Sequence, residues 1–239
     1  MHAFRENSSA PTRPLQHLPA GIAAVVTAAR GTVEAGCDFE RLVGSEGWRR
    51  LAPAIRPRFS EKPQADHPIR YVGTMQKVQC STAGLVLAQL CRLIGTPFAP
   101  YRGDGIPVVI SLHQGAVAGA TIWRREYRYP ARGAVQVQST KLIAPDGTLE
   151  ECVGCGLGMR LKVFELAGEL HFLSQRYFWC VLGRRICLPH LLSPGTAHVI
   201  HRDLGDGRFR FIMTFRHRLF GSLFYQDGVF AREGLAERN

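Results

Sequence analysis

The sequence predicts an α+β fold that is mainly antiparallel β: a curved, barrel-like meander of about nine or ten strands, with two N-terminal helices near one mouth. From Phe209 to Leu219, the odd positions are apolar apart from His217, and the even ones are mostly polar. This period of two is typical of an antiparallel strand with one buried face. From Gly105 onward similar runs recur roughly every 10 to 15 residues, with turn residues between them. A curved sheet with such tight turns favours closure, because closure removes exposed strand edges.

The two helices are expected over residues 38–51 and 83–94. Asp38 is a candidate N-cap for the first, and Pro53 and Pro57 end it. Residues 58–68 read as a loop that leads into a strand over 69–78. Ser81 or Thr82 caps the second helix, before Gly95 and Pro97 stop it. The later strands are expected over 106–114, 118–129, 134–143, 148–153, 157–166, 169–181, 196–203, 208–219 and 222–231.

One domain is expected over residues 37–232, after a disordered tail at 1–36 and before a short tail at 233–239. Within the first tail, residues 19–30 favour a short Ala-rich helix over a cleaved signal. No run of eighteen apolar residues occurs, so we expect no transmembrane segment. The seven cysteines are odd in number and scattered, which predicts reduced thiols and a cytoplasmic location.

The net charge of +11 comes mostly from arginine, which supplies 26 of the 30 basic residues. Arginine suits fork-like contacts to carboxylate or phosphate. On the predicted strand over 208–219, Arg208, Arg210, Arg216 and Arg218 share the wet face and could meet phosphates of nucleic acid or anionic lipid. That face lacks aromatic residues on which bases could stack. We therefore expect a solvated face and no nucleic-acid partner.

Several segments together resemble a bacterial family called domain of unknown function 4166. They are LAQLCRLIGTPFAP, TIWRREYRYP, ECVGCGLGMRLKV, GELHFLSQRYFW and GTAHVIHRDLGDGRFRFIMTFRHRLFGSLFYQDGVF, and the resemblance covers roughly Asp38 to Phe230. It implies no activity and no catalytic residues. Domains of this family are similar to those appended to saccharopine-dehydrogenase-like nucleotide-binding proteins, which implies an oxidoreductase partner supplied in trans. This chain lacks the Gly-x-Gly-x-x-Gly of a dinucleotide domain, so we expect no cofactor.

No metal site is expected either. Cys152 and Cys155 have the spacing of a metal or redox pair, but no second such pair exists, and a strand rather than a helix is expected to follow them. None of the nine histidines forms a His-x-x-x-His pair on a helix. We read Gly154 and Gly156 as a bend or bulge.

Strand parity places a few ionisable residues among buried neighbours. His217 shares a face with Phe211 and Phe215, and His201 with Val199. Arg125 falls with Trp123 and Tyr127, and Asp227 with Tyr225. Buried ionisable groups are costly unless they are paired. This set therefore predicts either an internal ion-pair network or the polar end of a ligand cavity.

Two functions follow from this set. The first is a binding module for a hydrophobic or amphipathic small molecule, with Arg125, Trp123, Tyr127, Tyr225 and Asp227 as ligand-binding residues. The alternative is an enzyme acting on a small anionic or lipid-like substrate. His217 or His201 would be its general acid/base, Asp227 its orienter and Arg125 an anion clamp. No catalytic motif is present, so the sequence favours binding.

Because Arg125 cannot lose its proton to escape burial, it needs an anionic partner. That partner is an internal carboxylate such as Asp227 or Glu151, or an anionic group of a ligand.

Overall fold

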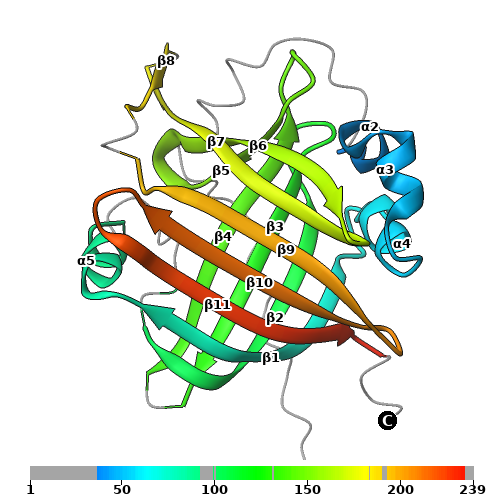
Figure 1. Ribbon diagram of the computed structural model, residues 1–239, viewed down its shortest axis with the longest axis horizontal. Coiled ribbons are helices and arrows are strands. Elements are labelled where there is room, and N and C mark those ends of the chain that lie inside the picture. Colours follow the sequence, from blue (N-terminus) through cyan, green and yellow to red (C-terminus); the bar gives the residue numbers. More distant parts are fainter. Residues whose placement is uncertain are drawn as a thin grey trace, which may run out of the picture.

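The computed structural model describes residues 37–91, 99, 101–130, 132–182, 184–189 and 193–234. The tail expected at 1–36, with its Ala-rich helix, lies outside the described residues, as do residues 235–239. In the described part, ten antiparallel strands close into a barrel, and an eleventh, β8, pairs only with β7 (Figure 1). The ten are β1 (Ile69–Cys80), β2 (Gly103–Gln114), β3 (Thr121–Tyr129), β4 (Gly133–Ile143), β5 (Leu149–Cys152), β6 (Leu157–Leu166), β7 (Glu169–Val181), β9 (Thr196–Gly205), β10 (Arg208–His217) and β11 (Gly221–Arg232).

The barrel is a meander in which each strand pairs with the next, and it closes where β1 pairs with β11. Closure pairs the first strand of the barrel with the last, as the tight turns predict. Alternation sets the inner face: Ile106, Val108, Ile110 and Leu112 of β2 are all buried, while the residues between them are exposed or half-buried. The expected fold class, mainly antiparallel and barrel-like, is confirmed.

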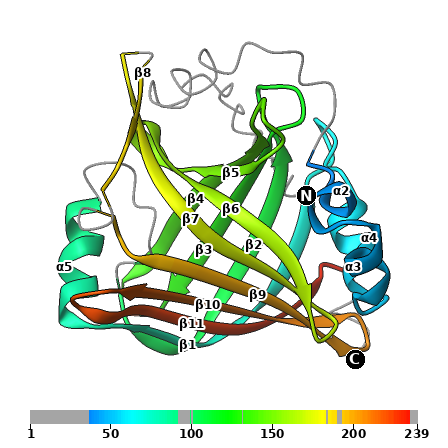
Figure 2. The same cartoon turned by 45° about the horizontal axis from the view of Figure 1, so that its top comes forward.

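One seam interrupts the wall of the barrel. β7 pairs with β9 only through Leu170 to Leu173, and its register with β6 shifts just beyond that point. The second half of β7 turns away from β9 and pairs with β8 (Arg184–Cys187) to form a projecting arm (Figure 2). The sequence analysis did not predict β8, because this strand is short and all four of its residues are exposed.

The helices differ from expectation in number and position. The helix expected over 38–51 is split into α2 (Phe39–Val43) and α3 (Ser45–Arg50), because Gly44 between them has a φ of 84°. A third helix, α4 (Ile55–Ser60), occupies the start of the expected loop. Pro57 is tolerated there because the first turn of a helix needs no N–H donor. Asp38 is the expected N-cap, accepting from the backbone N–H of Arg41.

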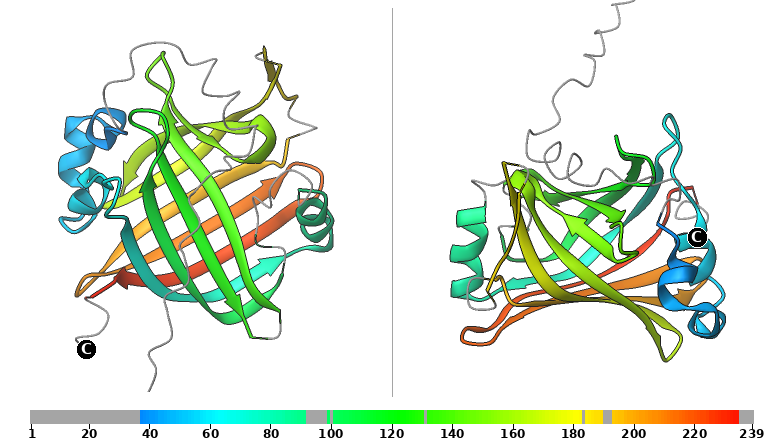
Figure 3. Two further views of the ribbon diagram at one scale, coloured as in Figure 1. Left: turned by 180° about the vertical axis from the view of Figure 1, so that it is seen from behind. Right: turned by 90° about the horizontal axis from the view of Figure 1, so that it is seen from above.

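The helices do not share one mouth, as the sequence analysis predicted. α2 to α4 lie at one end of the barrel, and α5 (Thr82–Cys91) lies at the other (Figures 2 and 3). Phe39, Trp48 and Phe59 of the first group pack with Leu170 and Phe172 of β7. α5 packs against β11 and β1 at this end of the barrel, so closely that Gly84 approaches the carbonyl of Leu223. We call these the α2–α4 end and the α5 end.

No helix among the described residues combines the length and apolar character needed to cross a membrane.

Candidate functional site: the barrel cavity

The barrel encloses a cavity of about 230 Å³. It runs from the middle of the barrel toward the α5 end, where Leu87, Ser193 and Pro194 form part of its wall. Most of the lining is apolar. The polar lining residues are Arg125, Tyr127, Ser139, Lys141, Glu151, Tyr177, Ser193, His201 and Gln226.

A charged cluster lies on one side of this cavity. Lys141 of β4 and Glu151 of β5 are directly opposed across the two strands, and the Lys141 Nζ lies 2.9 Å from the Glu151 Oε1. Both side chains are buried, with 7% and 10% of their surface exposed. Arg125 of β3 lines the same cavity, and no carboxylate among the described residues lies within ion-pair distance of it. The cluster therefore carries two cations and one anion.

Aromatic rings lie against the two cations of this cluster. The Lys141 Nζ lies 4.7 Å from the centroid of the Trp123 ring, and the Arg125 Cζ lies 6.0 Å from it. The Arg125 Cζ is also 5.8 Å from the Phe211 ring. Such rings attract cations through their π-faces while keeping water away. Arg125 and Trp123 thus lie on the cavity wall, as the parity of β3 predicts.

The electrostatic balance of the cluster is positive. Burial would raise the pKa of Glu151, but Lys141 and Arg125 outweigh it and hold that pKa below its usual value. Burial lowers the pKa of Lys141, and Arg125 lowers it further, against the opposing effect of Glu151. In an isolated ion pair, the carboxylate would raise the lysine's pKa. A second anion in the cavity would offset both the energetic cost of burying the two cations and the repulsion between them.

His201 is a neutral member of the wall. Its ring packs against Phe59, Phe172, Phe209 and Phe211. Burial, followed by the charges of nearby arginine and lysine side chains, lowers its pKa well below the usual value. The Nδ1 atom is buried and has no hydrogen-bond partner among the described residues. A histidine with so low a pKa is a weak proton acceptor at neutral pH.

Tyr127 and Gln226 hold two distant strands together at the cavity wall. The Tyr127 hydroxyl donates to the Gln226 Oε1 over 2.8 Å, which joins β3 to β11. Both side chains are almost fully buried. Tyr127 was expected to face the ligand and does line the cavity, but its hydroxyl is already bonded to Gln226.

Asp227 and Tyr225 face the opposite way from our sequence-based assignment. The register of β10 with β11 places Gln226 opposite Met213 on the inner face, so Asp227 lies outside. There it accepts two hydrogen bonds from Arg210, at 2.7 and 2.5 Å, and one from the Tyr225 hydroxyl. Alternation misled the assignment because β11 is apolar on both faces.

His217 does not share a site with His201. It ends β10, stacks on Phe220 with ring centroids 4.9 Å apart, and accepts from the backbone N–H of Leu219 through its Nδ1. It does not line the cavity. Of the three proposed catalytic residues, His201 alone lies on the cavity wall, so His217, His201 and Asp227 do not converge.

All seven cysteines are free thiols. Cys152 is buried on β5, whereas Cys155 is exposed in a bend with a φ of 56°, so the two thiols lie in different environments. No group of three or more His, Cys, Asp or Glu side chains suited to a metal ion occurs within the described ranges.

A second hollow, of about 310 Å³, lies at the α2–α4 end. Its wall includes Arg58 and Lys62, and it shares Trp123 and Lys141 with the barrel cavity. Trp123 and Lys141 therefore lie between the hollow at the α2–α4 end and the barrel cavity.

Sequence reasoning missed Lys141 as a site residue, although a signal was present. On β4, Val135, Val137, Ser139 and Lys141 share one parity, so a pattern that puts valine inside also puts Lys141 inside. Glu151 was considered only as a partner for Arg125, yet its direct partner is Lys141.

Comparison with protein families gives a match over residues 51–230 to the family described as Domain of unknown function (DUF4166). The chain belongs to the DUF4166 family. A search of curated proteins finds no relative. The DUF4166 match spans β1 to β10 and most of β11, and thus the whole cavity wall. α2 and α3 precede it. The charged cluster is therefore part of the DUF4166 domain itself.

Proposed function

We propose that the barrel binds a small amphipathic anion, with its carboxylate or phosphate beside Arg125 and its apolar part against the lining of the cavity. The observation that carries the proposal is that Arg125 reaches the cavity without a carboxylate partner among the described residues. Of the two internal candidates, Asp227 is bound by Arg210 on the outer face, and Glu151 is bound by Lys141. This leaves a ligand's anionic group as the partner of Arg125.

The size of the cavity limits the ligand. A cavity of about 150 Å³ holds benzene, and this one is about 230 Å³. The ligand is thus a compact molecule, such as one aromatic ring with a short acidic side chain. The volume of this cavity lies below the range of about 300 to 1,000 Å³ that is common for pockets that bind drug-sized ligands.

A matched pair of probes tests the proposal. Phenylpropionate and phenylpropionamide have nearly the same shape, but only the first carries a charge. At ten times its dissociation constant, a ligand stabilises the folded state by about 1.4 kcal/mol. This corresponds to a rise in melting temperature of about 3 to 5 °C for a chain of this size. We expect phenylpropionate to produce such a rise and the amide to produce less.

The variant Arg125→Met should remove this preference for the charged probe. In the unliganded protein it should leave stability unchanged or raise it, since it deletes a cation next to Lys141. The control is Arg124→Met, because Arg124 is the neighbouring arginine and bonds Gln138 on the outer face of β3. If Arg125→Met keeps the preference, or if Arg124→Met loses it equally, the anion does not bind at Arg125.

Enzymatic activity is the weaker alternative. Of the residues proposed as catalytic from the sequence, His201 lies on the cavity wall, and its depressed pKa makes it a poor base at neutral pH. The oxidoreductase partner in trans and the cytoplasmic location stay predictions. Co-purification at low ionic strength that recovers no nucleotide-binding oxidoreductase would count against the partner.

A further inference from the structure

Large apolar side chains are exposed at the α5 end of the barrel. Of the nine exposed large apolar side chains in the described part of the chain, Leu166 and Leu204 lie at the α2–α4 end. The other seven come from α5, from the arm formed by β7 and β8, and from the turn between β10 and β11. Exposed apolar side chains that cluster in one region often mark an interaction surface, whereas scattered single ones are normal.

The most exposed residues stand at the tips of two hairpins. Leu182, at the tip of the β7–β8 arm, is 95% exposed, and Ile186 beside it is 52% exposed. Leu219 and Phe220, in the β10–β11 turn, are 65% and 62% exposed. The arm, α5 and this turn lie on the same side of the molecule in all views (Figures 1, 2 and 3).

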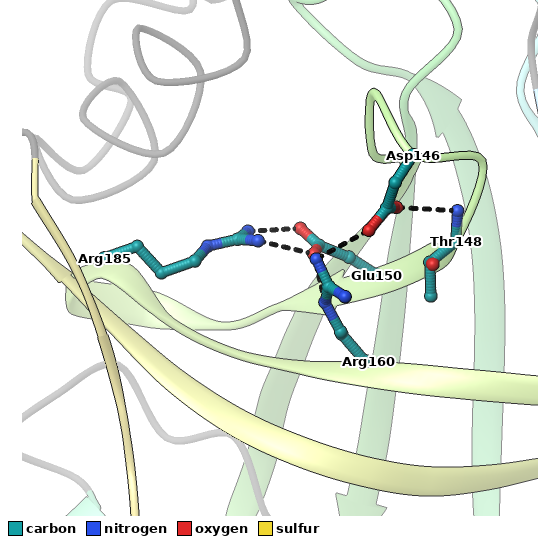
Figure 4. Close-up of polar contacts among 5 residues, drawn as sticks. All are labelled: Asp146, Thr148, Glu150, Arg160 and Arg185. Carbon is teal, nitrogen blue, oxygen red and sulfur yellow. Dashed lines mark hydrogen bonds and ion pairs between the residues drawn. The ribbon is translucent and has the colours of Figure 1, made fainter.

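The arm is fixed to the barrel rather than loose. Arg185 of β8 donates two hydrogen bonds, of 2.8 and 2.5 Å, to the two carboxylate oxygens of Glu150 on the outer face of β5 (Figure 4). Arg160 of β6 joins the same carboxylate at 3.4 Å and also pairs with Asp146. The Arg185 Cζ lies 3.9 Å from the centroid of the Phe178 ring. These contacts hold the apolar tip in a defined position.

Exposed arginines occur at both ends of the barrel, but the exposed acidic residues are concentrated at one. The exposed arginines at the α5 end are Arg102, Arg128, Arg132, Arg184, Arg185, Arg216 and Arg218. Among the described exposed acidic residues, Asp104 alone lies at this end. The others, which include Glu46, Asp66 and Asp206, lie at the α2–α4 end. The α5 end therefore carries both apolar tips and a strong positive charge.

We propose that the α5 end docks on an anionic lipid surface, with Leu182, Ile186, Leu219 and Phe220 entering the acyl boundary and the arginines contacting headgroup phosphates. Basic residues attract anionic membranes, and apolar side chains beside them gain from burial in the interface. Three of the four tip residues, Leu182, Ile186 and Leu219, favour lipid over nucleic acid, since aliphatic side chains offer bases no aromatic surface for stacking, and Phe220 is the aromatic exception. The barrel cavity reaches this same end, through Leu87 and Ser193. Docking requires no ligand and thus does not depend on the function proposed above.

Vesicle flotation tests the docking surface with the full chain. Vesicles of equimolar phosphatidylcholine and phosphatidylglycerol should bind the protein, and vesicles of phosphatidylcholine alone should bind it far more weakly. Each basic residue near an anionic surface contributes roughly fivefold to binding. Arg216→Gln with Arg218→Gln should therefore weaken binding about 25-fold. Leu182→Ser with Phe220→Ser should weaken it at least about tenfold.

Matched pairs at the α2–α4 end serve as controls. Arg49→Gln with Arg208→Gln removes the same charge from exposed positions there, and Leu166→Ser with Leu204→Ser removes equivalent apolar side chains. Both pairs should retain binding. Equal losses from these controls, or equal binding to neutral vesicles, would overturn the proposal. So would tight binding of a duplex oligonucleotide that depends on Arg216 and Arg218 but not on Leu182.

Discussion

The buried ion pair between Lys141 and Glu151 should respond very differently to the loss of each partner. Glu151→Gln removes the single carboxylate of the cluster and leaves Lys141 and Arg125 facing each other. Lys141→Met removes one of two cations and leaves Glu151 beside Arg125. We therefore expect Glu151→Gln to be clearly the more destabilising change.

The magnitude follows from burial and from the proton equilibrium of the lysine. Removing one partner of a buried pair typically costs about 3 to 5 kcal/mol. In Glu151→Gln the buried Lys141 can lose its proton instead of remaining charged without a partner. The loss of stability due to its charge therefore cannot exceed the cost of deprotonating an unfolded lysine, which is about 4.6 kcal/mol at pH 7. For Lys141→Met we expect about 1 to 2 kcal/mol, because Arg125 still compensates the carboxylate.

Urea denaturation at several pH values is the assay, because urea adds no ions that would screen the charges. In Glu151→Gln the pKa of Lys141 in the folded state falls further below its unfolded value. The unfolded chain then binds more protons, so the stability of the variant rises with pH, by about 1.4 kcal/mol per unit. The deficit of the variant relative to wild type should shrink to about 2 kcal/mol at pH 9.

The double variant, Lys141→Met with Glu151→Gln, is the control, since it keeps the net charge of the cluster unchanged. It should be more stable than Glu151→Gln alone. The reasoning fails if Lys141→Met costs as much as Glu151→Gln, or if the deficit of Glu151→Gln does not change between pH 7 and pH 9.

Two further predictions concern other buried groups. The pKa of His201 is depressed in the folded state, so below about pH 6.5 the unfolded chain takes up a proton that the folded chain does not, and stability falls as the pH falls. His201→Leu should therefore gain about 2 kcal/mol relative to wild type between pH 7 and pH 5 in urea titrations, and an unchanged difference would show that His201 is protonated in the fold. Burial raises the pKa of the Cys37 thiol to about 11, whereas Cys155 is exposed. Mass spectrometry after brief iodoacetamide treatment of the folded protein should find Cys155 alkylated and Cys37 intact, and early labelling of Cys37 would mean that the α2–α4 end opens.

The architecture could be predicted from local patterns because strands and turns in this chain carry clear signals. β6 and β7 span the expected residues, and the alternation of β10 assigns Phe209 and Phe211 to the interior. The helices were harder, because Gly44 and Pro57 act through backbone geometry that the apolar pattern does not record. The same pattern also gives no distance between elements, so it did not separate α5 from the other helices.

The candidate site was predicted where one strand face is distinctly drier than the other. On β3, Trp123 and Arg125 were assigned correctly to the interior. On β11 the assignment failed, because the buried Leu223, which packs with α5 at a register shift, shares its parity with Tyr225 and Asp227 on the outer face and makes that parity look like a core. Asp227 is buried there by Arg210 and Tyr225, which lie on the outside of the barrel. Parity alone does not distinguish a core from a covered outer surface.

The pairing of β1 with β11 has a consequence for how the chain reaches its fold. The two strands are the first and last of the barrel, so the final ladder joins segments that are far apart in sequence. Pairing of this kind slows folding, since a long loop must close before the contacts that stabilise it can form. Gln226, which bonds Tyr127 at the cavity wall, also belongs to the last strand. During synthesis the cavity is therefore incomplete until β11 has emerged, and a chain that stops before it presents two unpaired strand edges.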